Sequence, residues 1–283
     1  MPNIKPIKTE TDLKVALAGQ YRKQIENFLG SPEKALEFLS NVVASVQRTP
    51  KILECEPTSV INSFMLMASL KLMPSGVSGE AFVIPYNIKG TMVAQFQLGY
   101  QGLITLLYRA GNREVIAELV REHDKFVLSR GKITHEVDPR KTKEQRGEWI
   151  GAYAIIATAN GGTVEQYMTK DDILAHAKKF SKSFNSEYSP WNPENDPEGW
   201  LPRKTVLKQA GKLAPKNETL VRAIAADNRD SIIGDRLPDA MKQGGELTMG
   251  KLLNHENEDT NETQETKDEE AVIDITPEDK EGN

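Results

Sequence analysis

The first part of the chain has apolar residues at helical spacing. Between residues 11 and 29 they recur every three or four positions, which predicts one amphipathic helix. Ser31 followed by Pro32 is typical of a helix N-terminus, and the apolar spacing continues until just before Pro50. A third helix is predicted from about Pro57 to Leu72. Its apolar residues surround it almost completely, which indicates burial.

The pattern changes from a helical to an alternating period near residue 80. The runs EAFVIPY (80–86) and TMVAQFQL (91–98) are rich in β-branched and aromatic residues, and a turn-forming stretch separates them. They predict a β-hairpin, followed by a helix over LITLLYRAG (103–111) that ends at Gly111. Residues 113–129 favour strands. The runs 149–159 and 163–168 flank Asn-Gly-Gly, which predicts a second hairpin.

The C-terminal third begins with a short helix predicted over residues 170–180 and a polar loop over 181–198. Another helix is predicted within WLPRKTVLKQAGKLAP (200–215). We expect it to start at Pro202, because proline suits the first helical position and disfavours helical backbone at the residue before it. A last helix is predicted over residues 218–227.

The chain of 283 residues is long enough for one large domain or two ordinary ones. We expect a flexible N-terminus over residues 1–9 and a single domain over 10–233. Residues 234–283 are low in aromatic residues and strongly acidic, which predicts a linker and a disordered tail where partners dock.

Charge is unevenly distributed along the chain. Residues 251–283 carry twelve acidic and three basic residues, so this tail has a net charge of -9 while the whole chain has -5. The remaining body is therefore mildly basic, at about +4. The overall charge is consequently a poor argument against an anionic partner.

Cysteine usage and hydropathy favour a cytoplasmic protein. The single cysteine, Cys55, allows no disulfide framework within the chain. No run of about 18 apolar residues occurs, so we expect no membrane-spanning helix. The N-terminal stretch MPNIKPIKTETD lacks the apolar segment of a secretory signal.

A stripe of lysines marks the helix predicted within residues 200–215. Lys204, Lys208 and Lys212 lie four residues apart, with Arg203 beside them. Like charges at this spacing repel by about 0.2–0.5 kcal/mol per pair. An anionic ligand would offset the repulsion, and a solvated helix face is the alternative interpretation.

Basic residues gather with aromatic and amide side chains in three stretches, a composition typical of a groove that follows a phosphate backbone. Together these stretches suggest nucleic acid more strongly than each does alone. The residues expected to contact nucleic acid are Tyr100, Gln101, Arg109 and Arg113 in the first stretch, Lys178, Lys179 and Lys182 in the second, and Trp200, Arg203, Lys204, Lys208, Lys212 and Lys216 in the third.

Motifs of several enzyme classes are missing from the sequence. No phosphate-binding G-x-x-x-x-G-K-[ST] loop, G-x-S-x-G nucleophile motif or H-E-x-x-H zinc motif occurs. Cys55 and the four scattered histidines do not have zinc-ligand spacing. Asp171 and Asp172 fit the first turn of a helix better than a metal site. We therefore expect no catalytic residue, no metal and no cofactor.

Three segments resemble the RecT family of phage and prophage single-strand annealing proteins, which are distantly related to Red beta. They are LMPSGVSGEAFVIPYN (72–87), FQLGYQGLITLLYRAG (96–111) and the Trp-x-x-x-Lys-Thr-Val-x-Lys-x-x-x-Lys-x-x-Pro pattern of residues 200–215. The resemblance covers roughly residues 9–226 in the right order, and the acidic tail lies outside it.

The resemblance implies an α+β fold, with helices packed on a small antiparallel sheet and a projecting β-hairpin. It implies a protein that binds single-stranded DNA, anneals complementary strands without ATP, and assembles into rings or helical filaments. It also implies a cognate exonuclease and the host single-strand-binding protein as partners. Arg203, Lys204, Lys208 and Lys212 match the family's basic helix. We expect Arg203 and Lys204 in its first turn, where backbone N–H groups also contact phosphate.

Two other functions remain open from the residues alone. A structural assembly protein could pair its basic faces with the acidic tails of neighbouring subunits. A metal-dependent nuclease with a dispersed carboxylate site would carry no recognisable motif. Loss of assembly on tail removal would indicate the former, and magnesium-dependent strand cleavage the latter.

Overall fold

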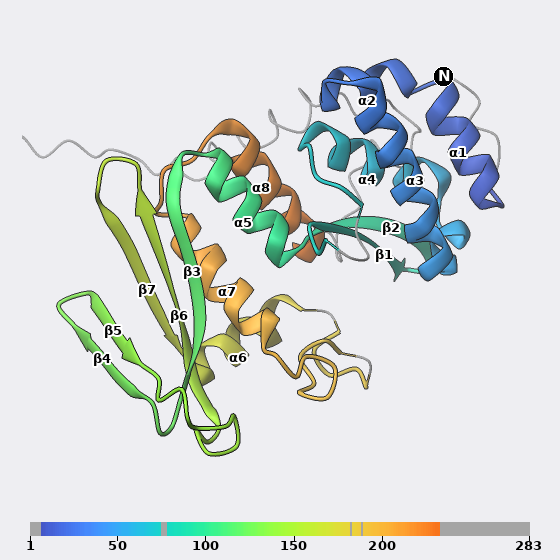
Figure 1. The fold of residues 1–283 in the computed structure, drawn as a ribbon. Helices are drawn as coiled ribbons and strands as arrows, with labels where there is room; N and C mark the ends of the chain where they lie inside the picture. Colours follow the sequence, from blue (N-terminus) through green and yellow to red (C-terminus); the bar gives the residue numbers. More distant parts are fainter. Residues whose placement is uncertain (1–6, 75–77, 182, 188, 233–283) are drawn as a thin grey trace, which may run out of the picture. The chain divides into compact units, whose positions relative to one another are not determined.

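The computed structural model describes residues 7–74, 78–181, 183–187 and 189–232, with side chains up to Asn228. The N-terminal part is helical (Figure 1), with α1 (Glu10–Gly19), α2 (Arg22–Leu29), α3 (Pro32–Arg48), the 3-10 helix η1 (Pro50–Glu54) and α4 (Pro57–Ser69). The predictions for α3 and its cap are confirmed, because the Ser31 side chain accepts a hydrogen bond from the Lys34 N–H and Pro32 is the first helical residue.

The single helix predicted over residues 11–29 is wrong in one respect, because the chain breaks between α1 and α2. Gly19 ends α1, and glycine is less favourable than alanine in a helix by about 1 kcal/mol. The half-buried Tyr21 then packs against the core at the start of α2. At the other end of α1, Thr9 and Asp12 form a capping box and Ile7 is buried. The folded domain therefore begins earlier than expected.

The first β-hairpin forms where the sequence predicted it. Strand β1 (Ala81–Ile88) pairs antiparallel with β2 (Thr91–Leu98). Lys89 and Gly90 both have positive φ, at 51° and 88°, as in the two-residue turns that match strand twist. Helix α5 (Tyr100–Arg109) follows directly.

The remaining strands form two further antiparallel sheets (Figure 1). The first sheet has the order β3-β6-β7, with β3 (Asn112–Arg121), β6 (Trp149–Thr158) and β7 (Thr163–Thr169). The second is the hairpin of β4 (Lys125–Ser129) and β5 (Lys132–Glu136). Helices α6 (Lys170–Phe180), α7 (Trp200–Gly211) and α8 (Glu218–Ile232) complete the fold. The expected α+β class is confirmed.

Strand alternation gives the three-stranded sheet two different faces. Ala152, Ala154 and Ile156 of β6 belong to the main hydrophobic core together with buried residues of α7. Tyr153, between them in sequence, contacts Phe126 and His135 of the β4–β5 hairpin. The sheet therefore carries α7 on one face and the hairpin on the other.

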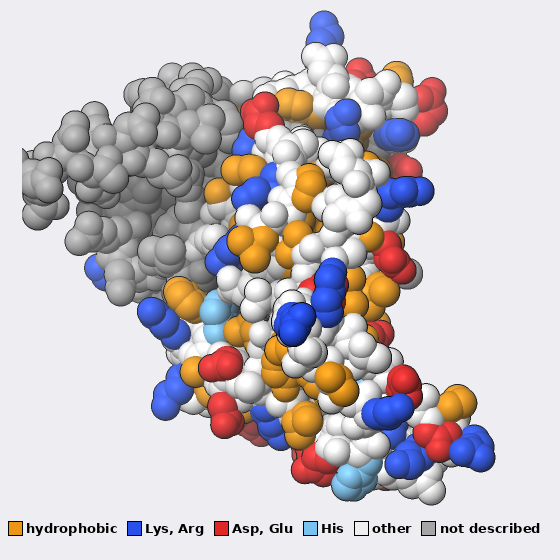
Figure 2. Space-filling model, turned by 90° about the vertical axis from the view of Figure 1, so that its left-hand side faces the viewer, with side chains coloured by type: hydrophobic (Ala, Val, Ile, Leu, Met, Phe, Trp, Pro, Cys, Tyr) orange, Lys and Arg blue, Asp and Glu red, His pale blue; other side chains and the backbone are white. Residues whose placement is uncertain are grey.

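Charged and apolar side chains are mixed on the face drawn in Figure 2. Lys and Arg side chains there alternate with acidic and hydrophobic ones over the described residues. A surface lysine is consequently no sign of an anion site by itself. Whether a basic residue is available to bind an anion depends on the contacts that it already makes.

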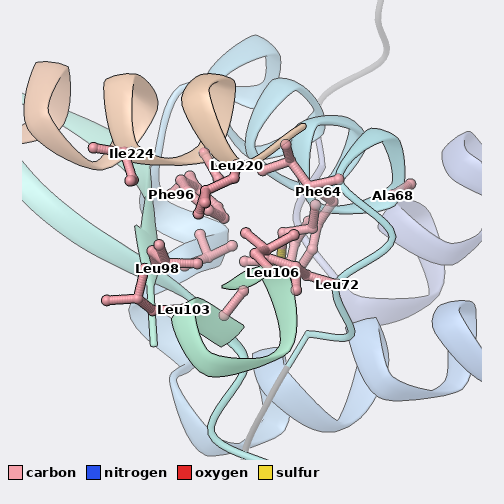
Figure 3. Packing of buried hydrophobic residues seen from close by; sticks show 14 of the residues in the cluster. Phe64, Ala68, Leu72, Phe96, Leu98, Leu103, Leu106, Leu220 and Ile224 are labelled. Carbon is pink, nitrogen blue, oxygen red and sulfur yellow. The ribbon is translucent and has the colours of Figure 1, made fainter. Parts of the chain in front are cut away.

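Helix α8 closes the core over the first hairpin (Figure 3). Its Leu220 and Ile224 lie against Phe96 and Leu98 of β2, close to Leu103 of α5. All of these side chains are buried. The last described helix is thus fixed to the segment that leads into α5.

Two glycines let backbone pack directly on backbone at the start of α5. A Cβ atom at Gly99 would overlap the carbonyl oxygen of Gly79, and one at Gly102 would overlap that of Glu80. The Gly99 N–H donates a 2.8 Å hydrogen bond to the Glu80 carbonyl. Any side chain at either glycine would push the two segments apart and displace Tyr100.

Some expectations were wrong or fall outside the described residues. Helix α7 starts at Trp200 instead of Pro202, and β5 was not predicted. The predicted flexibility of residues 1–6 and the predicted linker and disordered tail over 234–283 lie outside the part of the chain that the structure describes.

Candidate nucleic-acid interface

Helix α7 is the centre of the candidate interface, and it is more enclosed than its sequence suggested. The residues buried along it are Pro202, Thr205, Val206, Leu207, Ala210 and Gly211. Leu207 is fully buried, whereas Leu213, just after the helix, is 69% exposed. The lysine stripe therefore borders packed surface on both sides.

Two of the three stripe lysines are held by one carboxylate. Lys208 Nζ lies 2.5 Å from Asp227 Oδ2, and Lys204 Nζ lies 3.5 Å from Asp227 Oδ1. The Lys204 and Lys208 side chains are only 13% and 15% exposed, and that of Asp227 only 6%. The alternative interpretation, a solvated helix face, is thus wrong for these two residues, because α8 covers them.

Asp227 is fixed by β2 as well as by the lysines. The Leu98 N–H donates a 2.9 Å hydrogen bond to Asp227 Oδ1. Burial alone would raise the pKa of Asp227, but the two lysines and this hydrogen bond outweigh it and lower the pKa below its ordinary value. Burial also lowers the pKa of Lys204, against the attraction of Asp227. The cluster therefore joins α7, α8 and β2 through charge.

An aromatic pair lies at the N-terminal end of α7. The rings of Tyr100 and Trp200 are 5.4 Å apart, and the Arg203 guanidinium lies 5.1 Å from the Trp200 ring centre. Arg203 also forms a 3.0 Å ion pair with Glu118 of β3. The Trp200 side chain remains 44% exposed. This arrangement offers an exposed ring beside a cation, the combination on which nucleic-acid bases stack.

The first turn of α7 has its own cap, which was not expected. Asp196 accepts hydrogen bonds from the Trp200 and Leu201 N–H groups, at 2.9 and 2.8 Å. Because the helix starts at Trp200, Lys204 lies beyond the first turn and Arg203 at its end. Asp196 already satisfies two N–H groups of this turn, so phosphate would have to displace its carboxylate to reach them.

A second basic cluster surrounds His176 of α6. Burial lowers its pKa, and Lys208, Lys212 and Lys179 lower it further. The Gln209 side-chain amide lies 3.2 Å from His176 Nε2. An amide N–H donates, so the ring nitrogen accepts, which fits a neutral imidazole. This cluster brings together lysines of α6 and α7 that are far apart in the sequence.

The more exposed members of this cluster contact uncharged groups. Among the described residues no carboxylate pairs with Lys212 or Lys179. Lys212 Nζ contacts Gln209 Oε1 at 2.9 Å, and Lys179 Nζ lies 5.4 Å from the Phe180 ring centre. Lys216 donates to the Lys212 carbonyl. These exposed ammonium groups are the ones that an anion can reach directly.

Other sequence-predicted residues lie apart from this cluster or outside the description. Arg109 donates hydrogen bonds to the carbonyls of Leu70 and Lys71, just after α4, where a cation suits the helix dipole. Arg113 is exposed at the start of β3, Gln101 is exposed near Gly79, and Lys178 is exposed on α6. Lys182 lies outside the described residues.

Sequence reasoning missed the acidic residues that contact α7. A signal for Asp227 existed, because Leu220, Ala223, Ile224 and Asp227 follow the i, i+3, i+4, i+7 spacing of one helix face. A carboxylate at the end of an apolar stripe indicates a buried cationic partner. No comparable signal existed for Glu118, since its partner Arg203 is 85 positions away and half of its side chain is exposed.

Metal-binding clusters and membrane-spanning helices are both absent from the described residues. These residues contain no group of three or more His, Cys, Asp or Glu side chains placed to hold a metal ion. None of the described helices combines the length and apolar character needed to cross a membrane.

Comparisons with known proteins agree with the expected family. The sequence model of the RecT family matches residues 36–240. The uncharacterized protein YqaK of Bacillus subtilis (strain 168) is 31% identical over 186 residues, which make up 66% of this chain and 61% of YqaK. The matched part of this chain thus spans about three fifths of that relative's length.

Proposed function

This chain belongs to the RecT family, and from that premise we propose that it binds single-stranded DNA and anneals complementary strands without ATP. No covalent bond is made or broken in annealing, so the proposal needs no catalytic residue, metal or cofactor. The expected cytoplasmic location in a bacterial host belongs to the same proposal.

The observation that carries the proposal is the pairing of a cation-rich cluster with an aromatic platform on one helix. The exposed Lys212 of α7 and Lys179 of α6 both lie near enough to His176 to lower its pKa. Trp200, exposed at the other end of α7, has Tyr100 and Arg203 beside it. Lysines supply the non-specific attraction for phosphate, and an exposed indole supplies a surface on which any base stacks.

The size of this surface favours an assembly of several subunits. From Trp200 to Lys212 the helix rises about 18 Å, at about 1.5 Å per residue. At about 3.4 Å per nucleotide of a helical strand, this length covers about five nucleotides. Five base pairs make an unstable duplex, so stable annealing requires neighbouring subunits to hold one continuous strand. A ring or helical filament provides that arrangement.

Annealing follows from strand neutralisation and exposed base edges. Phosphate contacts lower the repulsion between two strands while leaving the bases free to test partners. Each correct step of pairing adds about 1.4 kcal/mol of stacking, so a matched second strand stays bound while a mismatched one dissociates. Base-edge recognition by the protein is unnecessary, and we expect little sequence preference.

Partners beyond DNA follow from the family premise. A nuclease that resects duplex ends would supply the single strand, and a host single-strand-binding protein would be displaced from it. We assign the acidic residues 251–283, with their net charge of -9, as the docking segment for such partners.

The test is annealing of two complementary labelled oligonucleotides by the full chain, without nucleotide cofactor, at low and moderate salt. We expect acceleration over the spontaneous rate, decreasing as salt rises, because counterion release drives binding. A scrambled second strand is the control for aggregation. Equal rates with and without protein at both salt concentrations would contradict the proposal.

The same samples decide between this proposal and its two rivals. An assembly protein would lose its oligomeric state when residues 234–283 are removed, and would not accelerate annealing before or after removal. A nuclease would shorten the labelled strand when magnesium is added. The annealing proposal expects strand length to stay constant and DNA binding to survive tail removal.

A further inference from the structure

The lysine stripe contains two lysines that DNA cannot reach in this conformation. Lys204 and Lys208 are 13% and 15% exposed and lie against Asp227 of α8, whereas Lys212 is exposed. If α7 binds the phosphate backbone, as proposed above, this part of the stripe has to open first. The element that covers it is α8.

The charges at this site are unbalanced. Two ammonium groups face a single carboxylate, with Nζ–Oδ distances of 3.5 and 2.5 Å. His176, which also lies near Lys208, is itself influenced by further lysines and not by a carboxylate. One positive charge thus stays unmatched in a poorly hydrated place, which is unfavourable. A DNA phosphodiester offers the same kind of oxygen acceptors as a carboxylate, with the same single negative charge, and the neighbouring phosphates of the strand add further negative charge.

The anchoring of α8 is uneven along its length. At its start, Asn217 donates to the Arg109 carbonyl and Asn112 donates to the Pro215 carbonyl. Leu220 and Ile224 add apolar contacts with β2 and α5 (Figure 3). Asp227 lies beyond them, about 15 Å along the helix from Asn217 at 1.5 Å per residue. Between Leu220 and Ile224, Arg222 donates a 3.3 Å hydrogen bond to the Ser69 side chain. A tilt about the start of α8 would therefore displace Asp227 more than it displaces these anchoring residues.

We infer that Asp227 occupies the position of a DNA phosphate between Lys204 and Lys208 in the DNA-free protein, and that DNA binding exchanges the carboxylate for phosphate as α8 tilts away. The inference rests on the proposed single-strand binding and adds its regulation. The lysines are never left without an anion, because the carboxylate leaves only as the phosphate arrives. Single-stranded DNA and the closed position of α8 are then competitors.

The Leu98 amide gives a direct readout in the unaltered protein. It donates to Asp227 Oδ1, so it loses its acceptor when Asp227 leaves. We expect hydrogen–deuterium exchange at Leu98 to accelerate when the full chain is saturated with a 40-nucleotide oligothymidine. Amides within the β1–β2 ladder serve as internal controls and should stay protected. Unchanged or slower exchange at Leu98 in the DNA-bound protein would overturn the inference.

An Asp227→Asn variant tests the competition from the other side. It keeps the shape of the side chain and removes the competing charge. We expect its affinity for the same oligothymidine to rise by about fivefold or more, the lower end of typical coupling between sites. Asp171→Asn, on the exposed first turn of α6, removes the same charge where no lysine is held, and we expect a change below about twofold.

The outcomes separate this inference from the proposed function. Wild-type protein that binds oligothymidine with a protected Leu98 amide, or an Asp227→Asn variant that binds more weakly, would leave single-strand binding intact and refute the exchange. Wild-type protein that binds no oligothymidine would refute both. If Asp227→Asn does not fold, the Leu98 measurement on the wild-type chain decides alone.

Discussion

At the scale of single residues, the same basic helix carries side chains in three different situations. Trp200 and Lys212 are exposed, Arg203 forms an ion pair with the half-exposed Glu118, and Lys204 and Lys208 are held at the buried Asp227. The free energy needed to break the existing contacts of each side chain, so that it can bind DNA, differs accordingly. Exposed pairs contribute at most about 1 kcal/mol, whereas separating a buried pair costs several times more.

Trp200 provides the first prediction at this scale. Replacing Trp200 with alanine removes the exposed ring that stacks on bases, a loss of about 1–3 kcal/mol for one stacked base. We expect single-strand affinity in a fluorescence anisotropy titration to fall by about 5- to 150-fold. Trp200→Phe should retain most of the affinity because a phenyl ring also stacks. Equal affinities for wild type, Trp200→Ala and Trp200→Phe would exclude stacking at this position.

His176 provides the second prediction, a dependence of DNA affinity on pH. Its pKa is lowered by burial and by Lys208, Lys212 and Lys179, so it is neutral at pH 7. A bound phosphate would favour the protonated ring and raise this pKa. Affinity should therefore increase as the pH falls below about 6.5, by no more than about tenfold per pH unit for one proton.

The control for this dependence is His176→Gln, which keeps a hydrogen-bonding side chain without the titration. The affinity of this variant should vary less between pH 7.5 and 5.5 than that of wild type. If DNA affinity depends on pH in the same way for wild type and His176→Gln, His176 is excluded from the interface.

The lowered pKa of His176 also affects the stability of the protein. Below about pH 6.5 the unfolded chain binds a proton that the folded chain does not, so the free energy of unfolding decreases there.

At the scale of elements, the β4–β5 hairpin depends on one buried carboxylate. Asp124 accepts hydrogen bonds from Arg146 Nε and Nη2, both at 2.8 Å, and from the Arg121 N–H at 2.8 Å. His135 of β5 lies 3.1 Å away, and the Asp124 side chain is 1% exposed. Burial alone would raise the pKa of Asp124, but these hydrogen bonds hold it well below its ordinary value.

Asp124→Asn should destabilise the protein by about 3–5 kcal/mol, the usual effect of removing one partner of a buried ion pair. Urea unfolding measures the change, and Asp138→Asn, whose partner Arg140 is exposed, should have little effect. In wild type the contribution of Asp124 is present above the ordinary pKa of about 3.9 and is lost as the pH falls toward the lowered value. Similar unfolding midpoints for both variants would contradict this role.

Most elements could be predicted from the sequence because their signals are local. Ser31-Pro32 marked the start of α3, and the β-prone runs around Lys89-Gly90 marked the first hairpin. The break between α1 and α2 could not be predicted, since the apolar spacing continues through it and packing of Tyr21 decides the geometry. The α7–α8 ion pairs depend on contacts between distant segments, which helix periodicity does not encode.

At the scale of the whole molecule, the family match and the candidate interface coincide. Residues 36–240 contain α6, α7 and α8, whereas α1 and α2 precede the match. Helices α1 and α2 pack Leu13, Leu17, Ile25 and Leu29 into the same core. These two helices therefore belong to the same core without contributing a side chain to the basic cluster. The acidic residues 251–283 lie outside the match, so any function they have is separate from that of the matched region.

The central claim is that the α6–α7 surface binds single-stranded DNA by neutralising phosphates, and its most direct test is the salt dependence of binding. The double variant Lys179→Gln and Lys212→Gln removes two exposed charges without breaking a described ion pair with an acid. A Lys204 and Lys208 variant would leave Asp227 buried without a partner and confuse binding with folding. Lys14→Gln with Lys34→Gln, both exposed on α1 and α3, is the matched control.

The measurement is the slope of log affinity against log salt concentration for an oligothymidine. The slope should decrease in magnitude by about 1.4 in the Lys179 and Lys212 variant, at about 0.7 per phosphate contact for single strands. The control variant should keep the wild-type slope. Equal slopes for all three proteins would contradict the assignment of DNA to α6 and α7, whatever the annealing activity of the protein.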